Sequence, residues 1–318
     1  MPLSDSDSTS PAPITVTAPA KINLALSVGP LRPDGFHELR TVFQAVDLYD
    51  SVTVRAAAEL ELELSGPEAT GLPADPGNLA WRAAALLAER AGRKPAVRIE
   101  LVKRIPVAAG LAGGSADAAA TLVACNRLWG LGLATRGLHA LAAELGSDVA
   151  FALHGGTALG TGRGETLTEL AAGQLHWVLA AAAGSLSTPA VYAELDRQRA
   201  AGREQHVRSG LAALDELAQA LRTGDPATLA PLLANDLQPA ALALAPYLRD
   251  TLAAGRRLGA LAGLVSGSGP TCAFLAADAE QARALAADLD ADPSCRFARA
   301  VVGGVPGATV LEPTAAAG

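Results

Sequence analysis

A glycine-rich segment that runs directly into an alanine-rich stretch constrains this chain more than any other feature. Residues 106–120 read PVAAGLAGGSADAAA, and the apolar stretch that follows continues to residue 131. Glycine adopts backbone angles that other residues avoid, and the start of a helix presents unpaired N–H groups and the positive end of its dipole. The segment therefore predicts a loop and a helix N-terminus that bind an anion, most naturally a phosphate group.

The same pattern is also typical of a simple turn in which Ser115 acts as the N-cap of the helix. No Gly-Lys-Ser/Thr sequence occurs, so the segment is not a Walker A motif, and it lacks the spacing of the Rossmann fingerprint. A second glycine loop, SGSGPT at 266–271, lies between two apolar stretches and on its own favours a plain turn. Two such loops in different domains suggest one nucleotide that is held from both sides.

The charge of the chain limits how it can bind anions. Its 318 residues include 25 basic and 32 acidic side chains, and the formal net charge is −7. A nucleic-acid or membrane-surface binder needs a basic face, and no run of Lys or Arg provides one. We therefore expect no nucleic-acid or membrane partner, and any anion must be held locally by backbone amides or a few placed cations.

Other features indicate a globular protein of the cytoplasm. Half of the residues are hydrophobic, enough for a sizeable core, but no run of about 18 apolar residues occurs that could span a membrane. Three widely spaced cysteines without a CxxC pattern indicate neither a disulfide framework nor a zinc cluster. Residues 1–12 have acids where a secretory signal has basic residues, so we expect a disordered tail and a cytoplasmic protein.

The spacing of apolar residues predicts an α+β chain of two domains, with a boundary near 165 to 175. The first domain covers residues 13–168. Its expected elements include strands at 14–28, interrupted near Pro19, at 46–57 and at 96–107, and a helix that begins after Asn78 and stops at Gly92.

The second domain, 169–318, is expected to open with a buried strand at 176–184. Two strands around the second glycine loop, a helix through residue 290 and a last strand FARAVV are expected to complete a small α+β unit. Between them, helices are expected from about 189 to 257, with breaks at Gly202, at 224–226 and at Pro239.

Two charged residues are candidates for catalysis. Lys21 lies in a predicted strand, and it is one of only three lysines among the 25 basic residues. A compact ammonium suits the space between a phosphate and an attacking hydroxyl, although a lysine on a solvated edge strand fits the pattern equally well. Asp148 precedes a short apolar stretch, which indicates either a helix N-cap or first-turn acid, or the general base for a hydroxyl nucleophile.

An aromatic pair, Phe36 and His37, follows a Pro-Asp-Gly turn. Such a pair can stack on a heteroaromatic base and hydrogen-bond to it, while the alternative is that Phe36 only anchors the loop. Neither HExxH nor GxSxG occurs, and no paired histidines have the spacing of metal ligands. Hydrolase chemistry therefore loses support, and phosphoryl transfer is the reaction type that the glycine loops favour.

Three segments, taken in order, resemble the motifs of the galactokinase, homoserine kinase, mevalonate kinase and phosphomevalonate kinase superfamily. They are APAKINLAL at 18–26, PVAAGLAGGSADAAA at 106–120 and SGSGPT at 266–271. The match spans about residues 14–275 in the right order. Within the superfamily, further segments are similar to those of kinases that act on a cytidylylated methylerythritol: RPDGFHEL at 32–39, GSDV at 146–149 and NDL at 235–237.

The resemblance implies a two-domain kinase fold, with an N-terminal ribosomal-protein-S5-like α+β domain, a C-terminal ferredoxin-like domain and the active site between them. It implies that ATP, with Mg²⁺, donates its γ-phosphate to the 2-hydroxyl of the cytidylylated methylerythritol, in the non-mevalonate route to isoprenoid precursors. The partner is then a small molecule that carries a cytidine diphosphate group. We expect no metal ligand from the protein, and a monomer or a weak homodimer.

The resemblance also assigns roles to residues. Lys21 and Asp148 match the catalytic lysine and aspartate of the family. Substrate contacts would come from Asn23, Phe36, His37, Tyr192, Gly267 and Ser268. The phosphates of ATP would lie on Pro106, Val107, Ala108, Ala109, Gly110, Leu111, Ala112, Gly113, Gly114, Ser115 and Ala116.

Some positions carry less information or depart from the family pattern. Phe36 stands where Tyr is more usual, which removes a hydroxyl but keeps a ring that can stack, and Ala150 replaces a proline. Lys94 and Lys103 are assigned ordinary places, in a solvated helix-to-strand connection and at a strand end near the phosphate loop. A kinase for another small alcohol, such as mevalonate or homoserine, and a nucleotide-binding protein without catalysis stay open as alternatives.

Overall fold

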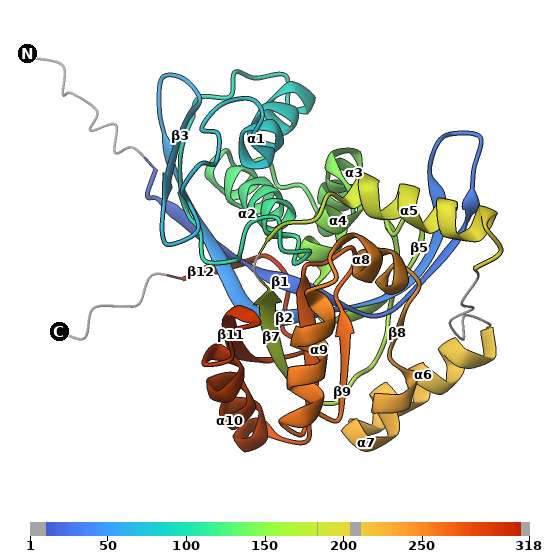
Figure 1. Ribbon diagram of the computed structural model, residues 1–318. Coiled ribbons are helices and arrows are strands. Elements are labelled where there is room, and N and C mark those ends of the chain that lie inside the picture. The colour runs from blue at the N-terminus through green and yellow to red at the C-terminus, as the bar shows by residue number, and fades with distance from the viewer. Residues whose placement is uncertain (1–10, 183, 204–210, 313–318) are drawn as a thin grey trace, which may run out of the picture.

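The computed structural model describes residues 11–182, 184–203 and 211–312. In these residues the chain forms two β-sheets, each covered by helices (Figure 1). The expected disordered tail falls almost entirely on residues 1–10, which lie outside the described residues, so that prediction is not tested.

A long pair of antiparallel strands, β1 (Ile14–Leu31) and β2 (His37–Ala56), runs through the larger sheet. Within the described residues this sheet has eight strands, in the order β12-β1-β2-β4-β3, with β5 and β6 beside β2 and β8 beside β1. The bounds of the added strands are β3 (Glu61–Ser65), β4 (Val97–Val102), β5 (Thr157–Gly162), β6 (Thr166–Glu169), β8 (Ala234–Asn235) and β12 (Thr309–Leu311).

Pro19 lies inside β1 but does not end it, so the expected interruption takes a milder form. The pairing of β1 with β2 shifts register between Pro19 and Ala20, and again between Asn23 and Ala25. Proline has no N–H to donate to a neighbouring strand, so a register shift is where a sheet tolerates it. Between the two shifts, Lys21 and Asn23 are two residues apart and project from the same face of the strand.

Helices α1 (Leu79–Arg90), α2 (Gly113–Leu128), α3 (Thr135–Leu145) and α4 (Ser147–His154) cover the larger sheet. α2 contacts β1, β2 and the three other helices, so it lies at the centre of this layer (Figure 1). Its alanines are fully buried, and their small side chains let the neighbouring elements approach closely. This explains why the alanine-rich stretch shows no clear polar face.

The two helix starts predicted from the sequence have different outcomes. The side chain of Asn78 accepts a hydrogen bond of 2.9 Å from Ala80 N, which confirms Asn78 as the N-cap of α1. The prediction that Ser115 caps α2 is wrong, because the helix begins two residues earlier, after Ala112 in the left-handed conformation. No side chain caps α2, so its first N–H groups are left for another partner.

The smaller sheet is antiparallel and, as far as the chain is described, has four strands in the order β11-β7-β10-β9. Numbered along the chain this order is 4-1-3-2, with helices after the first and third strands, as in a ferredoxin-like unit. The expected α+β fold with a ferredoxin-like C-terminal domain is therefore confirmed. The bounds are β7 (His176–Ala182), β9 (Ala262–Val265), β10 (Thr271–Ala276), α10 (Ala279–Asp290) and β11 (Cys295–Val302).

Several short helices connect β7 to β9, as the sequence predicts. Gly202 and residues 224–226 fall between or just at the start of helices, as expected. The break expected at Pro239 falls just before it: β8 separates the helices, and Pro239 lies in the first turn of the next one, where its missing N–H costs nothing. The helices are α5 (Thr188–Ala200), α6 (Leu211–Thr223), α7 (Pro226–Leu229), α8 (Gln238–Leu244) and α9 (Leu248–Arg257), with a 3-10 turn η1 (Ala230–Leu232) after α7.

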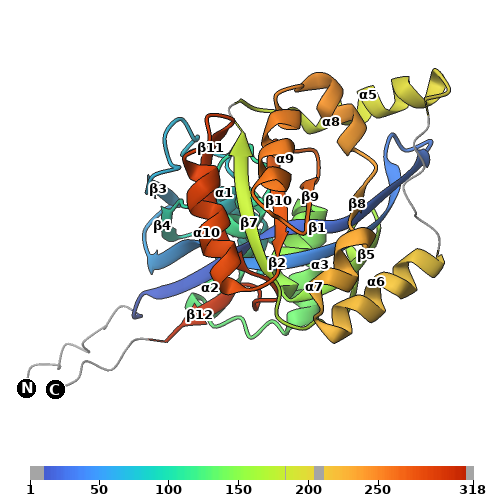
Figure 2. The same cartoon turned by 60° about the horizontal axis from the view of Figure 1, so that its bottom comes forward.

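The two sheets are joined by buried side chains and by returns of the chain. Gln44 of β2 accepts a hydrogen bond of 2.8 Å from the indole of Trp177 on β7, and Gln44 donates one of 2.9 Å to Thr157. β8 and β12 come from the second half of the chain, yet both pair with β1 (Figure 2). The predicted boundary between residues 168 and 169 stays a prediction, but these two strands cross it.

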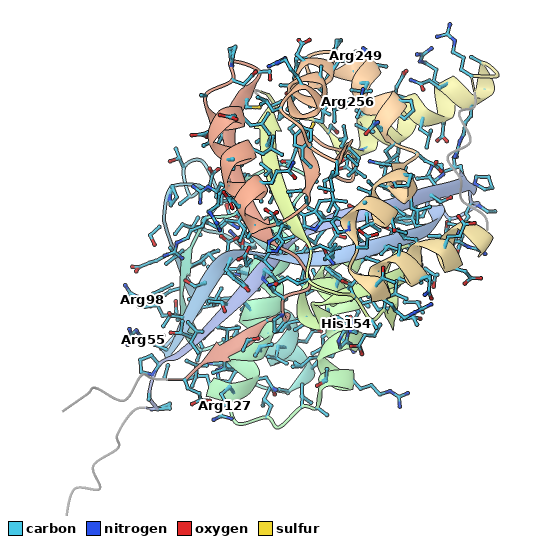
Figure 3. All side chains as sticks on the ribbon, turned by 90° about the horizontal axis from the view of Figure 1, so that it is seen from below. Arg55, Arg98, Arg127, His154, Arg249 and Arg256 are labelled. Atoms are coloured by element: carbon cyan, nitrogen blue, oxygen red, sulfur yellow. The ribbon has the colours of Figure 1, made fainter. Side chains whose placement is uncertain are left out.

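Basic side chains are distributed over the surface of the fold. The arginines labelled in Figure 3 come from β2, β4, α2 and α9 and point outward, with Arg55 and Arg98 beside each other on neighbouring strands. Among the described residues, no helix is long and apolar enough to cross a membrane.

Packing between α9 and β10 leads to a first testable prediction. A Cβ added to Gly255 of α9 would lie 2.1 Å from the buried ring of Phe274. We expect Gly255→Ala to lower the free energy of unfolding by about 1–3 kcal/mol, because neither the helix nor the ring can move away freely. Urea denaturation followed by circular dichroism measures this change.

Gly137→Ala in α3 is the matched control, because the nearest atom to its added Cβ is 3.8 Å away. This substitution should leave the stability unchanged or raise it by up to about 1 kcal/mol, because alanine favours a helix. Equal losses in the two variants would contradict the packing of Gly255 against Phe274.

Candidate active site

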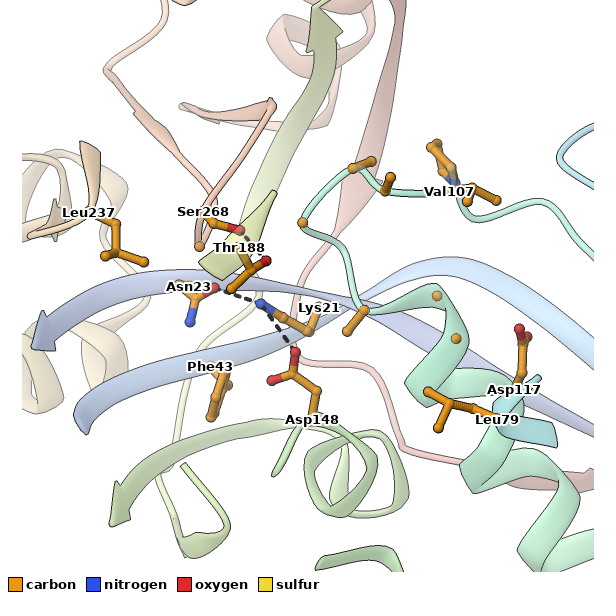
Figure 4. A pocket seen from close by; sticks show the side chains of 18 of the residues that line it. Lys21, Asn23, Phe43, Leu79, Val107, Asp117, Asp148, Thr188, Leu237 and Ser268 are labelled. Carbon is orange, nitrogen blue, oxygen red and sulfur yellow. Dashed lines mark hydrogen bonds and ion pairs between the residues drawn. The ribbon is translucent and has the colours of Figure 1, made fainter. Parts of the chain in front are cut away.

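A cavity of about 430 Å³ lies where β1, both glycine loops and the starts of several helices meet (Figure 4). Of the residues assigned from the sequence, its walls include the following: Lys21, Asn23, Asp148, Tyr192, Gly267, Ser268, Pro106, Val107, Ala108, Ala109, Gly110, Ala112, Gly113 and Gly114. The cavity walls do not include Phe36, His37, Leu111, Ser115 or Ala116.

Lys21 and Asp148 face each other across the base of the cavity (Figure 4). Lys21 Nζ lies 3.8 Å from Asp148 Oδ2 and donates a hydrogen bond of 2.8 Å to Asn23 Oδ1. The Lys21 side chain is 9% exposed, whereas that of Asp148 is 36% exposed. A buried cation beside a more open carboxylate leaves Asp148 accessible to a ligand that enters the cavity.

The surroundings of Lys21 exclude the alternative of a solvated lysine on an edge strand. Its backbone N–H donates a hydrogen bond of 3.1 Å to Leu111 O, so the first glycine loop lies against β1 at this residue. Asn23, which accepts from Lys21, donates in turn to Thr41 Oγ1 at 2.8 Å, and Thr41 donates to Ala25 O. These bonds hold the ammonium in one position.

Asp148 is placed by α4. Gly146 is the N-cap of this helix, so Asp148 is a first-turn acid rather than the cap itself. A carboxylate near a helix N-terminus is stabilised by the unpaired N–H groups and the dipole. Ala150, where the family pattern has proline, is buried within the same helix, which therefore forms without that proline.

The two glycine loops, which the sequence places in different domains, meet at Gly110. This residue has φ +76°, and a Cβ added to it would lie 2.8 Å from Ser266 O and 2.9 Å from Gly269 O. Thr271 N also donates a hydrogen bond of 3.3 Å to Ala109 O. The backbone of the first loop packs directly on the backbone of the second, and only glycine leaves room for this contact.

The second glycine loop reaches Lys21 and is held by a side chain from β8. A Cβ added to Gly267 would lie 3.3 Å from Asn23 Oδ1 and 3.4 Å from Lys21 Nζ. Asn235 donates two hydrogen bonds of 2.7 Å, to Val265 O and Gly267 O, and these bonds hold the loop in place. This gives a structural reason for the Asn-Asp-Leu segment that the sequence singled out.

Several helix N-termini border the cavity, among them those of α1, α2, α4 and α5. Gly113 begins α2, Asp148 lies in the first turn of α4, and Thr188 begins α5. Thr188 Oγ1 and Ser268 Oγ are 2.8 Å apart, so the start of α5 is tied to the second glycine loop. Helix N-termini favour anions, so this arrangement suits a ligand rich in phosphate although the protein is acidic.

Lys103 is more than an ordinary strand end, as the sequence had assigned it. It is 1% exposed, and its ammonium binds the carboxylates of Asp50 and Asp117, at 2.7 Å from Asp117 Oδ2. Asp50 also accepts hydrogen bonds from the backbone of Arg104 and Ile105, which immediately precede the first glycine segment. This buried triad supports the loop from behind, and nothing in the local sequence of Lys103 indicates it.

The triad shifts the pKa values of its members. Burial raises the pKa of Asp117 well above the ordinary carboxyl value, and the nearby charge of Lys103 only partly opposes this. Burial lowers the pKa of Lys103, but the charges of Asp117 and Asp50 outweigh it and leave that pKa above its ordinary value. Two carboxylates share one ammonium, so the triad has an excess negative charge in the core.

The aromatic residues are arranged differently from the expectation. His37 stacks on Tyr192 with ring centroids 5.2 Å apart, donates a hydrogen bond from Nδ1 to Gly29 O, and has Nε2 3.3 Å from Asp196 Oδ2. Phe36 is 46% exposed outside the cavity. Burial, together with the charge of Asp148, raises the pKa of Tyr192 to about 12, so its hydroxyl stays neutral.

Sequence reasoning missed part of the cavity wall. Leu26, Leu39, Asp117 and Leu237 lie in motifs noted above but were not assigned to the site, and the other residues reach it from strands, turns and helix ends without a local motif. The missed residues are Leu26, Leu39, Thr41, Phe43, Leu72, Pro73, Gly77, Asn78, Leu79, Lys103, Asp117, Arg163, Thr188 and Leu237.

Comparisons with known proteins place this geometry in a family. Residues 78–156 match the GHMP kinases N terminal domain, and residues 217–294 match the GHMP kinases C terminal domain. A 4-diphosphocytidyl-2-C-methyl-D-erythritol kinase of Mycolicibacterium gilvum is 58% identical over 94% of this chain and 93% of its own length. The chain belongs to the 4-diphosphocytidyl-2-C-methyl-D-erythritol kinase family. It is therefore a small-molecule kinase, as the sequence predicted.

Further members of the 4-diphosphocytidyl-2-C-methyl-D-erythritol kinase family agree. A relative from Mycobacterium tuberculosis is 56% identical over 92% of this chain and 91% of its own length. A crystal structure of a 4-(cytidine 5'-diphospho)-2C-methyl-D-erythritol kinase matches with a TM-score of 0.74 and 36% identity, over 92% of this chain and 99% of that one. Leishmania major mevalonate kinase, at 16% identity and a TM-score of 0.75 over 96% of this chain and 100% of that one, shares the fold.

The Asp50–Lys103–Asp117 triad predicts how stability depends on pH. The pKa of Asp117 is raised in the folded protein, so the folded state binds a proton more tightly than the unfolded state does. This contribution is full below the ordinary carboxyl pKa of 3.8 and is lost as the pH rises toward the folded pKa. We expect Asp117→Asn, which cannot titrate, to gain stability relative to the wild type as the pH rises above 3.8.

Asp288→Asn is the control, because Asp288 is exposed on α10. The difference in unfolding free energy between this variant and the wild type, measured in urea, should stay the same over that pH range. If the stabilities of the wild type and of Asp117→Asn changed in parallel with pH, this would contradict the raised pKa of Asp117.

Proposed function

We propose that this protein transfers the γ-phosphate of ATP to the 2-hydroxyl of 4-diphosphocytidyl-2-C-methyl-D-erythritol, a step of the non-mevalonate route to isoprenoid precursors. The observation that supports this most directly is the pairing of Lys21 with Asp148 at the point where both glycine loops meet. The high identity to kinases named for this substrate supports the choice of acceptor. A cytoplasmic location and a monomer or weak homodimer stay predictions.

In the proposed reaction Asp148 acts on the acceptor. Its carboxylate is the exposed member of the pair with Lys21, so the 2-hydroxyl can approach it. The carboxylate orients this hydroxyl and takes its proton as the oxygen bonds to the γ-phosphorus, while the bond from phosphorus to the ADP oxygen breaks. The neutral Tyr192 hydroxyl nearby adds no further negative charge to this region.

Lys21 stabilises the charge that develops in this step. Its ammonium is held by Asn23 and lies 3.8 Å from Asp148, between the acceptor site and the glycine loops. A fixed positive charge in a largely buried site lowers the energy of the phosphoryl oxygens in the transition state without reorganising. The second glycine loop, through Gly267, keeps the space next to the ammonium narrow.

We assign the phosphates of ATP to the first glycine loop and the uncapped start of α2. The N–H groups there have no side-chain cap, and phosphate oxygens are suitable acceptors for them. Mg²⁺ bound with ATP prefers oxygen ligands and commonly needs only one or two carboxylates besides the phosphates. The phosphates and water would supply most of these oxygen ligands, which leaves Asp148 free for the acceptor hydroxyl, and the metal would neutralise part of the phosphate charge.

For the cytidine end of the acceptor, Tyr192 and its neighbour His37 are the best-supported contacts. Tyr192 lines the cavity and its ring already stacks on His37, which leaves aromatic surface beside Asn23 and Ser268. Stacking a base on such a ring needs only the π-face. Contacts from Phe36 require a shift of its loop, because Phe36 lies outside the cavity wall.

The proposed function is tested by measuring ADP release with the cytidylyl acceptor, mevalonate and homoserine in parallel. We expect turnover with the cytidylyl acceptor alone. Turnover with mevalonate or homoserine instead would assign the protein to another small alcohol, and ATP binding without turnover on any acceptor would revive a non-catalytic nucleotide-binding protein.

The assigned chemistry predicts the effect of two substitutions. Asp148→Asn and Lys21→Met should each lower kcat by about 10²–10⁴-fold, because one removes the proton acceptor and the other the fixed charge. ATP binding, measured by calorimetry, should change far less, because neither residue belongs to the glycine loop that we assign to the phosphates.

Glu280→Gln, at an exposed position of α10 outside the cavity wall, is the control and should keep kcat within about twofold. Near-native turnover in both Asp148→Asn and Lys21→Met would show that the roles assigned to them are wrong, even if the substrate is correct.

A further inference from the structure

Arg163 is a basic side chain of the cavity wall that has no part in the proposed phosphoryl transfer. The cavity is lined by three basic side chains, Lys21, Lys103 and Arg163. Lys21 is paired with Asp148, and Lys103 with Asp50 and Asp117. Within residues 11–182, 184–203 and 211–312, no carboxylate lies within ion-pair distance of the Arg163 guanidinium.

Arg163 is held toward the site by its backbone and by an aromatic ring. It lies in the turn between β5 and β6, where its own N–H donates a hydrogen bond of 2.7 Å to Glu165 and Gly162 N donates one of 3.2 Å to Glu38. The centre of its guanidinium lies 3.9 Å from the centroid of the Phe36 ring. A cation over an aromatic face is attracted to it without being neutralised.

The turn that carries Arg163 also touches the segment that carries the proposed base. Gly164 is buried, and a Cβ added to it would lie 3.5 Å from the ring of Phe43 and 3.6 Å from the Cβ of Ser147. Ser147 immediately precedes Asp148. Arg163 therefore extends from the wall beside the proposed hydroxyl site and ends on the ring of Phe36, the residue before His37.

The chemistry of the acceptor fits this position. In the proposed substrate a diphosphate joins the methylerythritol, which must reach Asp148, to the cytidine, which needs an aromatic surface. The diphosphate must then lie between those two places, and its negative charges require a partner in a protein with a net charge of −7. A planar guanidinium can donate two parallel hydrogen bonds to phosphate oxygens, which suits it better than an ammonium for this contact.

We propose that Arg163 binds the diphosphate of the cytidylyl acceptor and so contributes to selectivity for an acceptor that carries one. This inference rests on the proposed function for the identity of the acceptor. It concerns acceptor binding only: the ATP phosphates are assigned to the first glycine loop and the transferred group to Lys21 and Asp148.

The test compares Arg163→Met, which keeps much of the length but no charge, with Arg163→Lys, which keeps the charge but not the planar donor. We expect Arg163→Met to raise KM for the cytidylyl acceptor by about tenfold or more, with kcat and KM for ATP within about twofold of the wild type. Arg163→Lys should show a smaller increase in the same constant. Thermal unfolding of each variant checks that the fold is intact.

Arg127→Met is the matched control, because it removes the same charge from the far end of α2, away from the cavity (Figure 3). It should leave KM for the acceptor unchanged. An increase equal to that of Arg163→Met would assign the effect to the net charge of the protein and overturn the proposal.

Binding of CDP and of cytidine, measured by calorimetry, separates the diphosphate from the base. Arg163→Met should weaken CDP binding about tenfold and leave cytidine binding within about twofold. Equal losses for both ligands would mean that Arg163 acts through Phe36 on the base, and no loss for either would also overturn the proposal. If the wild type turns over the acceptor and Arg163→Met behaves identically, this inference alone is refuted. If the wild type is inactive on the acceptor, the proposed function is refuted as well.

Discussion

The packing of one glycine loop on the other is the contact on which the site depends. Gly110 lies so close to Ser266 O and Gly269 O that no Cβ fits, and its φ of +76° also favours glycine. Through this contact the loop before α2 and the loop between β9 and β10 become two walls of one cavity. The hydrogen bond from Lys21 N to Leu111 O then aligns β1 with both loops, so the position of the lysine follows from backbone contacts.

Charge is arranged locally in this acidic protein. Lys21 and Lys103 are both committed to carboxylates, and the starts of α2, α4 and α5 direct helix dipoles at the same cavity. Anions can therefore be attracted over a few ångströms by N–H groups and single cations, in a chain whose sequence has no run of Lys or Arg. The guanidinium of Arg163, which has no carboxylate partner among the described residues, fits the same principle. A single well-placed charge can attract an anion without a broad positive field.

Much of the fold was predictable because its signals are local. The N-cap at Asn78, the buried strand β7 and the strands on both sides of the second glycine loop follow from short patterns and are confirmed. Ser115 was misjudged as a cap because the left-handed Ala112 starts α2 earlier, a conformation that no propensity favours for alanine. Lys103 was misjudged because Asp50 and Asp117 come from 53 and 14 residues away.

By itself, the sequence determined the α+β class, the glycine loops, the family and the candidates Lys21 and Asp148, since each depends on residue types in fixed local spacing. Only the tertiary structure decided that Lys21 Nζ lies 3.8 Å from Asp148 while Phe36 lies outside the cavity and under Arg163. The physical reason is that distances between side chains of distant segments depend on register shifts, helix starts and turn packing. A displacement of a few ångströms in any of these decides whether two groups can interact.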